Sequence, residues 1–231
     1  MGSNVDFIFL DNNQGDMQSD LERGMAKRIV GYEELMKKVP DLIEEKVPDP
    51  RIWLDTGCGT GGLIRANIKR FPKAQFVLAD PSSDNIATAK QLMNGEQRCL
   101  YVTVPTDKLN FGDSTLDVVT AMFCHHYYSD IEEKRKSIGN CFRMLKNGGI
   151  FITAEHVRHE DQESADKEWI SFMTGAGLPE EFAEEMVSRR DKEYFPLSES
   201  AYVELLKECG FSEIEVFWST CSDIGITARK A

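Results

Sequence analysis

Residues 54–62 read LDTGCGTGG, and the glycines at positions 57, 59 and 62 have the G-x-G-x-x-G spacing of a dinucleotide-binding turn. The turn follows an apolar segment, residues 51–54, and precedes Leu63 and Ile64, which begin a helical pattern. Glycines let the backbone approach a ligand closely, and the N-terminus of the following helix favours negative charge. The stretch predicts a ligand site, and the chemistry of that ligand depends on the residues around the glycines.

Apolar and amphipathic segments alternate along most of the chain. The expected strands are residues 51–54, 75–79, 99–103, 117–122, 150–154, 213–218 and 224–229. The expected helices between them are residues 63–71, 83–93, 138–145 and 202–209. This alternation indicates a parallel α/β sheet with right-handed crossovers, and the short final link indicates an antiparallel hairpin. The predicted fold is a doubly wound, seven-stranded, Rossmann-like sheet in a single domain over residues 1–231.

Two helical segments lie outside this alternation. About residues 17–45 form an N-terminal cap of two helices, at about residues 17–30 and 32–42, which break at Gly31. About residues 160–196 form a two-helix insertion after strand five, which breaks at 175–177. An insertion at the carboxyl edge of the sheet can close over a ligand, and the alternative is a solvated helical pair without a ligand.

Composition limits the classes of partner. The chain has 231 residues and a formal net charge of −12, which disfavours direct nucleic-acid or membrane binding and leaves a small molecule as the expected partner. Its six cysteines lack C-x-x-C spacing, which indicates reduced thiols and a cytoplasmic location. No signal peptide is recognised at the start, and no apolar run reaches the roughly 20 residues of a membrane span.

Two aspartates decide which ligand fits the glycine turn. Asp55 lies two residues before the first glycine, where a carboxylate would repel a pyrophosphate but suits an ammonium group. Asp80 ends the second expected strand, where an acid can accept hydrogen bonds from both hydroxyls of a ribose. A ligand with a ribose, an ammonium group and no required phosphate is described better by S-adenosylmethionine (SAM) than by NAD.

The motif at 54–61, LDTGCGTG, resembles the D-x-G-C-G-T-G motif of class I SAM-dependent methyltransferases. Residues 109–111, 115–119 and 144–149 resemble the family's segments around strand four and before strand five. The resemblance covers nearly the whole chain and implies SAM as cofactor, S-adenosylhomocysteine as product and a possible homodimer. The implied cofactor-binding residues are Tyr32, Asp55, Gly57, Cys58, Gly59, Gly61, Asp80, Pro81, Thr106 and Phe123. Thr106 is included in this set because VPT at 104–106 stands where the family often has an acid that contacts adenine.

A closer resemblance is to the carboxy-SAM synthases and their small-molecule methyltransferase relatives. It depends on IVGY at 29–32 and on the C-terminal segments 217–221 and 228–231. In that group a tyrosine matching Tyr32 and an arginine from the insertion reach the cofactor. Arg189 and Arg190 lie near the arginine's position, although an ungapped alignment places Val187 there, and Phe123 replaces the synthases' asparagine.

The stretch FCHHYYS at 123–129 follows strand four at the expected mouth of the site. His126, or else His125, is the candidate general base, because an imidazole titrates near neutral pH. Alternatively, these histidines only shape the pocket, and His156 or His159 acts as the base. No histidine spacing is typical of a metal site, so no metal is expected.

The expected substrate-binding residues are Tyr127, Trp169, Arg189 and Arg190. The aromatic residues, Tyr32 and Tyr128 included, can line an acceptor pocket or belong to the core. The two arginines can bind a substrate carboxylate or pair with neighbouring acids on the surface.

The preferred function is methyl transfer from SAM to a small acceptor by in-line displacement, in which the enzyme mainly positions the acceptor. The alternatives are a carboxy-SAM synthase using SAM and prephenate, a noncatalytic SAM-binding protein and an NAD-dependent oxidoreductase.

Overall fold

The structure is a computed structural model that describes residues 17–231, with side chains from residue 23 onward. Residues 1–16, where no signal peptide is recognised in the sequence, lie outside the described residues. The helices are α1 (Met17–Arg28), α2 (Tyr32–Lys46), α3 (Gly62–Asn67), α4 (Ser83–Leu92), α5 (Ile131–Met144), α6 (Gln162–Gly175), α7 (Glu180–Ser188) and α8 (Glu199–Glu208), with the 3-10 helices η1 (Thr106–Lys108) and η2 (His125–Tyr127). The strands are β1 (Ile52–Thr56), β2 (Gln75–Ala79), β3 (Cys99–Val102), β4 (Leu116–Met122), β5 (Leu145–Arg158), β6 (Leu197–Ser198), β7 (Ser212–Ser219) and β8 (Asp223–Arg229).

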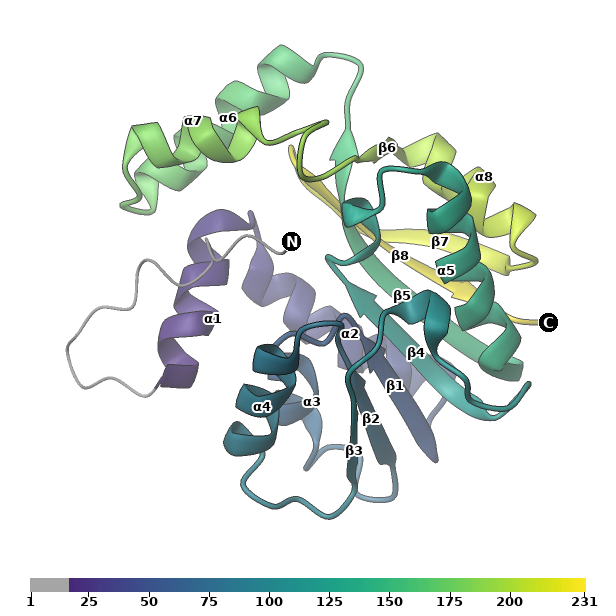
Figure 1. Ribbon diagram of the computed structural model, residues 1–231. Helices are drawn as coiled ribbons and strands as arrows, with labels where there is room; N and C mark the ends of the chain where they lie inside the picture. The colour runs from purple at the N-terminus through teal and green to yellow at the C-terminus, as the bar shows by residue number, and fades with distance from the viewer. Residues whose placement is uncertain (1–16) are drawn as a thin grey trace.

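A single twisted sheet runs through the middle of the described chain (Figure 1). Its strand order is β3-β2-β1-β4-β5-β8-β7, and β6 pairs with β5 beyond this path. The strands β1 to β5 are parallel, whereas β8 is antiparallel to both β5 and β7. The predicted mostly parallel, Rossmann-like sheet with an antiparallel C-terminal hairpin is confirmed, with β6 as an addition.

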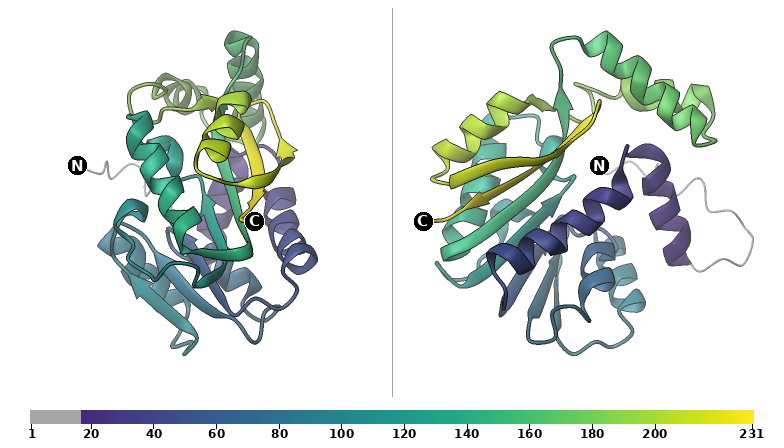
Figure 2. Two further views of the ribbon diagram at one scale, coloured as in Figure 1. Left: turned by 90° about the vertical axis from the view of Figure 1, so that its right-hand side faces the viewer. Right: turned by 180° about the vertical axis from the view of Figure 1, so that it is seen from behind.

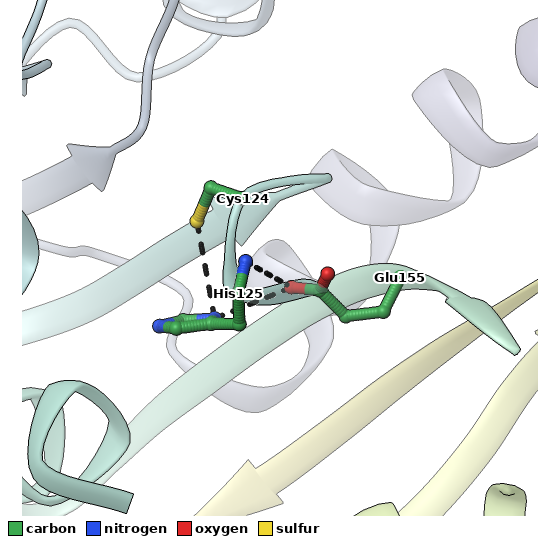
Figure 3. Close-up of side chains that lie close together, drawn as sticks. All are labelled: Cys124, His125 and Glu155. Carbon is green, nitrogen blue, oxygen red and sulfur yellow. Dashed lines mark hydrogen bonds and ion pairs between the residues drawn. The ribbon is translucent and has the colours of Figure 1, made fainter. Parts of the chain in front are cut away.

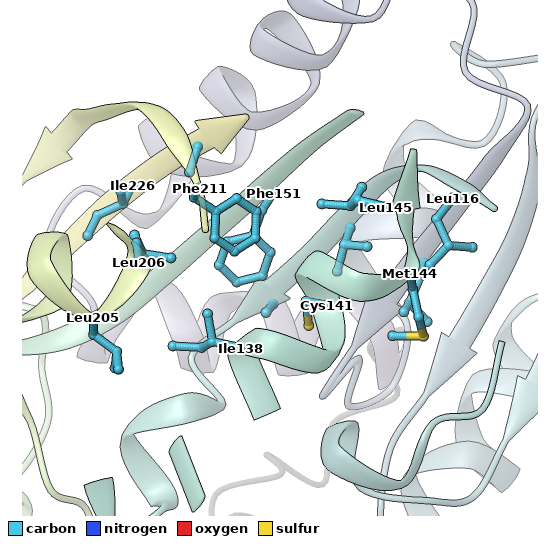
Figure 4. Close-up of a cluster of buried hydrophobic side chains, with 14 of the residues drawn as sticks. Leu116, Ile138, Cys141, Met144, Leu145, Phe151, Leu205, Leu206, Phe211 and Ile226 are labelled. Carbon is cyan, nitrogen blue, oxygen red and sulfur yellow. The ribbon is translucent and has the colours of Figure 1, made fainter. Parts of the chain in front are cut away.

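Apolar side chains cover both faces of the sheet. On one face Val39 of α2, Ile64 of α3 and Ala89 of α4 pack with Trp53 and Ile152 in one buried cluster. The other face carries α5 and α8, whose buried side chains meet Phe151, Phe211 and Ile226 (Figure 4). Strands buried on both faces need nearly continuous apolar sequence, which explains the apolar runs in β1, β4 and β5.

Three element boundaries differ from the sequence-based expectation. The helix expected to end near residue 42 continues through Pro40 to Lys46, and its Ile43 is buried in line with Val39. The helix expected to reach residue 71 ends at Asn67. Leu145 was expected on a helix, but its backbone is extended and it pairs with Leu116 as the start of β5. For Leu145, pairing within the sheet outweighs local helical periodicity.

The helical insertion, α6 and α7, follows β5 and projects beyond the sheet toward α1 (Figures 1 and 2). Trp169, Met173, Ala183 and Tyr194 form its own small buried cluster. The indole Nε1 of Trp169 donates a hydrogen bond of 2.7 Å to the carbonyl of Arg28. The insertion is therefore joined to the N-terminal helices above the carboxyl edge of the sheet.

All six cysteines lie in the described part of the chain and are free thiols. No helix among residues 17–231 is both long enough and apolar enough to cross a membrane.

Candidate cofactor and acceptor site

A cavity of about 650 Å³ opens at the carboxyl ends of β1, β2, β4 and β5. Its base is formed by the loops after these strands, and its upper wall is formed by α1, the start of α2 and the helical insertion. The cavity is lined by these predicted site residues: Tyr32, Asp55, Gly57, Cys58, Gly59, Asp80, Pro81, Thr106, Phe123, His126, Tyr127, Trp169 and Arg189. Gly61, His125 and Arg190 are absent from the cavity wall.

Gly57, Gly59 and Gly61 of the turn all have positive φ, but they have two separate roles. A Cβ on Gly57 would lie 2.4 Å from the Cβ of Cys124, and a Cβ on Gly61 would lie 2.7 Å from Leu78 Cδ2. A Cβ on Gly59 would meet no atom within 4 Å. Gly57 and Gly61 are therefore needed for packing, and Gly59 is the glycine that leaves room for a ligand in the cavity.

Asp80 connects the glycine turn to the start of α4. Its Oδ2 accepts a hydrogen bond of 2.9 Å from the Gly59 N–H, and its Oδ1 accepts from Ser82 N at 2.9 Å and Asn85 Nδ2 at 3.1 Å. The carboxylate borders the cavity directly after β2. It holds the turn in shape and presents an anionic edge on which ribose hydroxyls can donate hydrogen bonds.

Asp55 is buried at the carboxyl end of β1, opposite Thr120 of β4. The Thr120 hydroxyl donates a hydrogen bond of 2.7 Å to Asp55 Oδ1. Burial raises the pKa of Asp55 to about 7 against the opposing effect of this hydrogen bond, and the nearby Asp80 charge adds to the increase. A cation in the cavity would favour the ionised carboxylate, so this aspartate fits an ammonium ligand.

Thr106 contacts the cavity from η1, on the side of the loop after β3. Its hydroxyl shares a 2.7 Å hydrogen bond with the Thr56 hydroxyl, and its carbonyl accepts from Asn140 Nδ2 at 2.8 Å. Asn140 Nδ2 also donates a hydrogen bond of 2.9 Å to the Leu109 carbonyl. The Asn140 side chain thus joins η1 to α5. These hydrogen bonds hold η1 in place as one wall of the cavity.

The two adjacent histidines are held by one buried carboxylate, Glu155 of β5, which Figure 3 shows beside His125. Its oxygens accept the backbone N–H groups of His125 and His126 at 3.0 and 2.9 Å, and they contact the Nδ1 atoms at 3.2 and 2.7 Å. The Thr153 hydroxyl adds a fifth donor at 2.9 Å. Although burial alone would raise it, these hydrogen bonds hold the pKa of Glu155 well below its usual range.

His126 borders the cavity, whereas His125 lies in the interior beside Phe151. Burial lowers the pKa of His126 to about 4, and the neighbouring His156 adds to this decrease against the opposing charge of Glu155. His126 is therefore neutral at pH 7. Since Nδ1 faces Glu155, Nε2 is the ring nitrogen that remains for a ligand.

His156 also lines the cavity, one residue beyond Glu155 on β5. Its Nδ1 lies 2.6 Å from Oδ1 of the buried Asp223 on β8. His159, the fourth histidine, does not line the cavity; its backbone N–H donates to Gln162 Oε1. Sequence reasoning named His156 only as an alternative and missed Glu155 and Asp223. The polar pair Glu155-His156 directly after an apolar strand was the available signal.

The insertion contributes Trp169, Arg189 and Arg190 to this region, and η2 contributes Tyr127. Trp169 is buried and lines the cavity, whereas Tyr127 lies at its mouth with 59% of its surface exposed. Arg189 lines the cavity and forms an ion pair with Glu193. Arg190 faces away and binds both carboxylate oxygens of Asp166, at 2.8 and 2.5 Å.

Among the described residues, Cys124, His125 and Glu155 bring three potential metal-binding atoms within 4.8 Å of one another. The Glu155 oxygens already accept five donors, and the Cys124 thiol contacts the Thr56 carbonyl at 3.5 Å. Burial also raises the pKa of the Cys124 thiol well above its usual range, which opposes the thiolate that a metal needs. The Cys124 and Glu155 side chains are therefore engaged in hydrogen bonds.

These features fit SAM. Gly59 leaves open space for the ligand, the Asp80 carboxylate after β2 can accept ribose hydroxyls, and the buried Asp55 carboxylate can pair with an ammonium group. A glycine turn with acids at the ends of the first two strands defines a SAM-type rather than a pyrophosphate-type Rossmann site. Residues 54–149 match the family model described as a methyltransferase domain. This chain is similar to class I SAM-dependent methyltransferases, and the matched residues contain the glycine turn and Asp80.

Several known proteins are similar to this chain. A sterol 4-C-methyltransferase of Caenorhabditis elegans is 31% identical over 59% of this chain and 41% of its own length. A carboxy-SAM synthase of Trichodesmium erythraeum is 24% identical over 80% of this chain and 74% of its own. The solved structure of human N-acetylserotonin methyltransferase with SAM has a TM-score of 0.63 at 16% identity, covering 91% of this chain and 56% of that one. Several curated relatives thus extend well beyond the matched region.

Gly59→Ala and Gly148→Ala form a matched pair that tests the glycine turn. Both positions have positive φ with no atom within 4 Å of an added Cβ, but only Gly59 borders the cavity. Each substitution is expected to lower the free energy of unfolding by about 1 kcal/mol. Only Gly59→Ala should weaken binding of S-adenosylhomocysteine, by more than about tenfold, in calorimetric titration. Equal affinities for the two variants would contradict the assignment.

The pKa of Asp55 predicts pH-dependent cofactor affinity. Because the group is protonated below about pH 7 in the free protein, affinity for S-adenosylhomocysteine should rise from pH 5.5 to 7.5. The slope should approach a factor of about 10 per pH unit at the acid end. Asp55→Asn should bind more weakly at pH 7.5 and lose the slope, as measured by calorimetry. A variant with the slope of the wild type would show that another group titrates.

Glu155→Gln tests the buried carboxylate. The variant should lose about 3 kcal/mol of unfolding free energy at pH 7, because donors that faced an anion then face a neutral amide. The folded pKa of Glu155 lies below its unfolded value, so its contribution is present above about pH 4.5 and is lost as the pH falls further. The difference between wild type and variant in urea unfolding should therefore shrink from pH 5 to pH 3. The exposed Glu184→Gln is the control and should change stability by less than about 0.5 kcal/mol.

Proposed function

We propose that this enzyme transfers the methyl group of SAM to a small-molecule acceptor. The observation that carries the proposal is one continuous cavity that extends from the glycine turn to His126, His156 and Trp169. Its volume of about 650 Å³ lies within the range of single small-ligand pockets, so a bound cofactor leaves room only for a compact acceptor. The helices above the cavity oppose access by a large polymer.

SAM supplies an activated methyl group, so the protein need not provide a nucleophile. The contribution of the chain is to position the acceptor and exclude water, which is worth about 7–11 kcal/mol in well-oriented systems. The glycine turn, Asp55 and Asp80 fix the cofactor end of the cavity. The insertion, joined to α1 through Trp169 and the Arg28 carbonyl, encloses the acceptor end.

A carboxy-SAM synthase activity is the second candidate. It is favoured by the similarity to the Trichodesmium enzyme over 80% of this chain and by the position of Arg189 in the cavity wall. An arginine there can bind a carboxylate of the ligand. The pairing of Arg189 with Glu193 and the presence of Phe123 after β4 favour methyl transfer instead.

The proposed setting follows from surface and composition. The net charge of −12 favours a small-molecule partner over direct nucleic-acid binding. Six free thiols are in keeping with a reducing compartment such as the cytoplasm. A homodimer is proposed only by analogy with related enzymes.

Calorimetry and labelling test the proposal together. The purified protein should bind SAM and S-adenosylhomocysteine but not NAD, and it should move label from methyl-labelled SAM into a pooled metabolite extract. Mass spectrometry of the copurifying nucleoside should find SAM or S-adenosylhomocysteine. Copurified carboxy-SAM with no label transfer would favour the synthase, and binding of SAM with neither outcome would indicate a noncatalytic protein.

A further inference from the structure

A second histidine–carboxylate pair faces the cavity independently of Glu155. His156 of β5 stands opposite Asp223 of β8 in the antiparallel register, which places the two side chains together. The distance of 2.6 Å between His156 Nδ1 and Asp223 Oδ1 fixes Nδ1 as the protonated nitrogen. The other oxygen of Asp223 accepts the Ser222 hydroxyl at 2.5 Å. Nε2 of His156 is therefore the nitrogen left for an acceptor.

Aromatic rings surround His156 on the cavity side. Ring centroids lie 4.5 Å away for His126, 4.9 Å for Tyr194, 5.3 Å for Trp169 and 5.9 Å for Phe123. These five rings, which we call the acceptor compartment, all line the same cavity. Flat apolar walls with imidazole nitrogens among them suit a planar ring that carries a protic group.

The carboxylates of Glu155 and Asp223 differ in the number of hydrogen bonds that they accept. Glu155 accepts five donors from the loop and from β5, so its charge is spread over backbone and side-chain groups. Asp223 accepts only His156 and Ser222 among the described hydrogen bonds. His156 also keeps 13% of its side chain exposed, against 1% for His126. His156 is thus the histidine better placed to return a proton to water.

We propose that His156, positioned by Asp223, is the general base and that the acceptor is the hydroxyl of a phenol or planar enol. This inference rests on the proposed methyl transfer. In the step, an O–CH3 bond forms as the C–S bond of the sulfonium breaks, with its electron pair left on sulfur. The acceptor's proton passes to Nε2 of His156 and then to water. His126 stays neutral and forms part of the wall.

Several charged or titratable groups surround His156. Asp223 contacts it from β8, His126 faces it from η2, and Glu155 precedes it on β5. Asp166 of α6, Arg190 and Tyr194 after α7, and Cys221 and Ser222 before β8 line a small cavity on its other side. Arg190 and Asp166 neutralise one another as an ion pair, which leaves Asp223 as the main charge acting on His156.

The first test measures protonation without turnover. In full-length protein labelled with ¹⁵N-histidine and saturated with S-adenosylhomocysteine, NMR should show the proton of neutral His156 on Nδ1, which faces Asp223. Asp223→Asn should increase the population that carries the proton on Nε2 instead. A wild-type His156 with its proton on Nε2 would overturn the proposal, and this measurement needs no variant to fold.

The second test measures methyl transfer to a panel of phenols, enolic 1,3-diketones and primary amines. His156→Gln should reduce transfer to the preferred phenol or enol by about 100-fold or more and abolish the pH dependence of kcat, with affinity for S-adenosylhomocysteine within about threefold of wild type. His159→Gln, outside the cavity, is the matched control and should behave as wild type. Transfer by His156→Gln with the rate and pH profile of wild type would overturn the proposal.

The same assays separate this inference from the proposed function. Label that enters a metabolite extract but no phenol or enol probe would reject the acceptor class while methyl transfer stands. SAM binding without label transfer to the extract or to any probe would reject methyl transfer itself.

Discussion

The ligand edge of this sheet is governed by one constraint, namely that buried carboxylates need hydrogen-bond donors or cations around them. Asp55, Asp80, Glu155 and Asp223 are all buried at this edge. The first three lie at or near the carboxyl ends of parallel strands, and Asp223 begins an antiparallel strand, so its start meets the same edge. Strand direction alone thus brings together four acids from distant parts of the sequence.

The donors available to each acid determine its role. Glu155 has five donors and acts as a clamp between β5 and the loop after β4. Asp80 has three and closes the glycine turn around itself. Asp55 accepts a hydrogen bond from the Thr120 hydroxyl, and burial raises its pKa to about 7. The least satisfied acid is therefore the one that gains most from a cationic ligand.

The cofactor half of the cavity could be predicted from sequence because its determinants are local. Asp55, the glycines and Asp80 stand at fixed distances from predictable strands, and a parallel sheet collects such positions at one edge. The acceptor half depends on longer-range geometry. His156 and Asp223 are 67 residues apart and meet only through the register of β5 with β8, which composition and periodicity do not determine. The length of β5 was missed for the same reason, since Leu145 joins the sheet only through its pairing with Leu116.

The two arginines of the insertion show why adjacent residues of the same type can have different roles. Arg190 makes a two-point ion pair with Asp166, and both side chains are largely enclosed, so this pair is committed to holding α6 against the segment after α7. Arg189 pairs with Glu193 four residues along the chain, and the Glu193 side chain is 43% exposed. The Nε atom and a terminal nitrogen of Arg189 both contact the same Glu193 oxygen, and the Arg189 side chain is only 17% exposed. Arg189 therefore borders the cavity as part of a partly enclosed ion pair, whereas Arg190 holds α6 against the segment after α7.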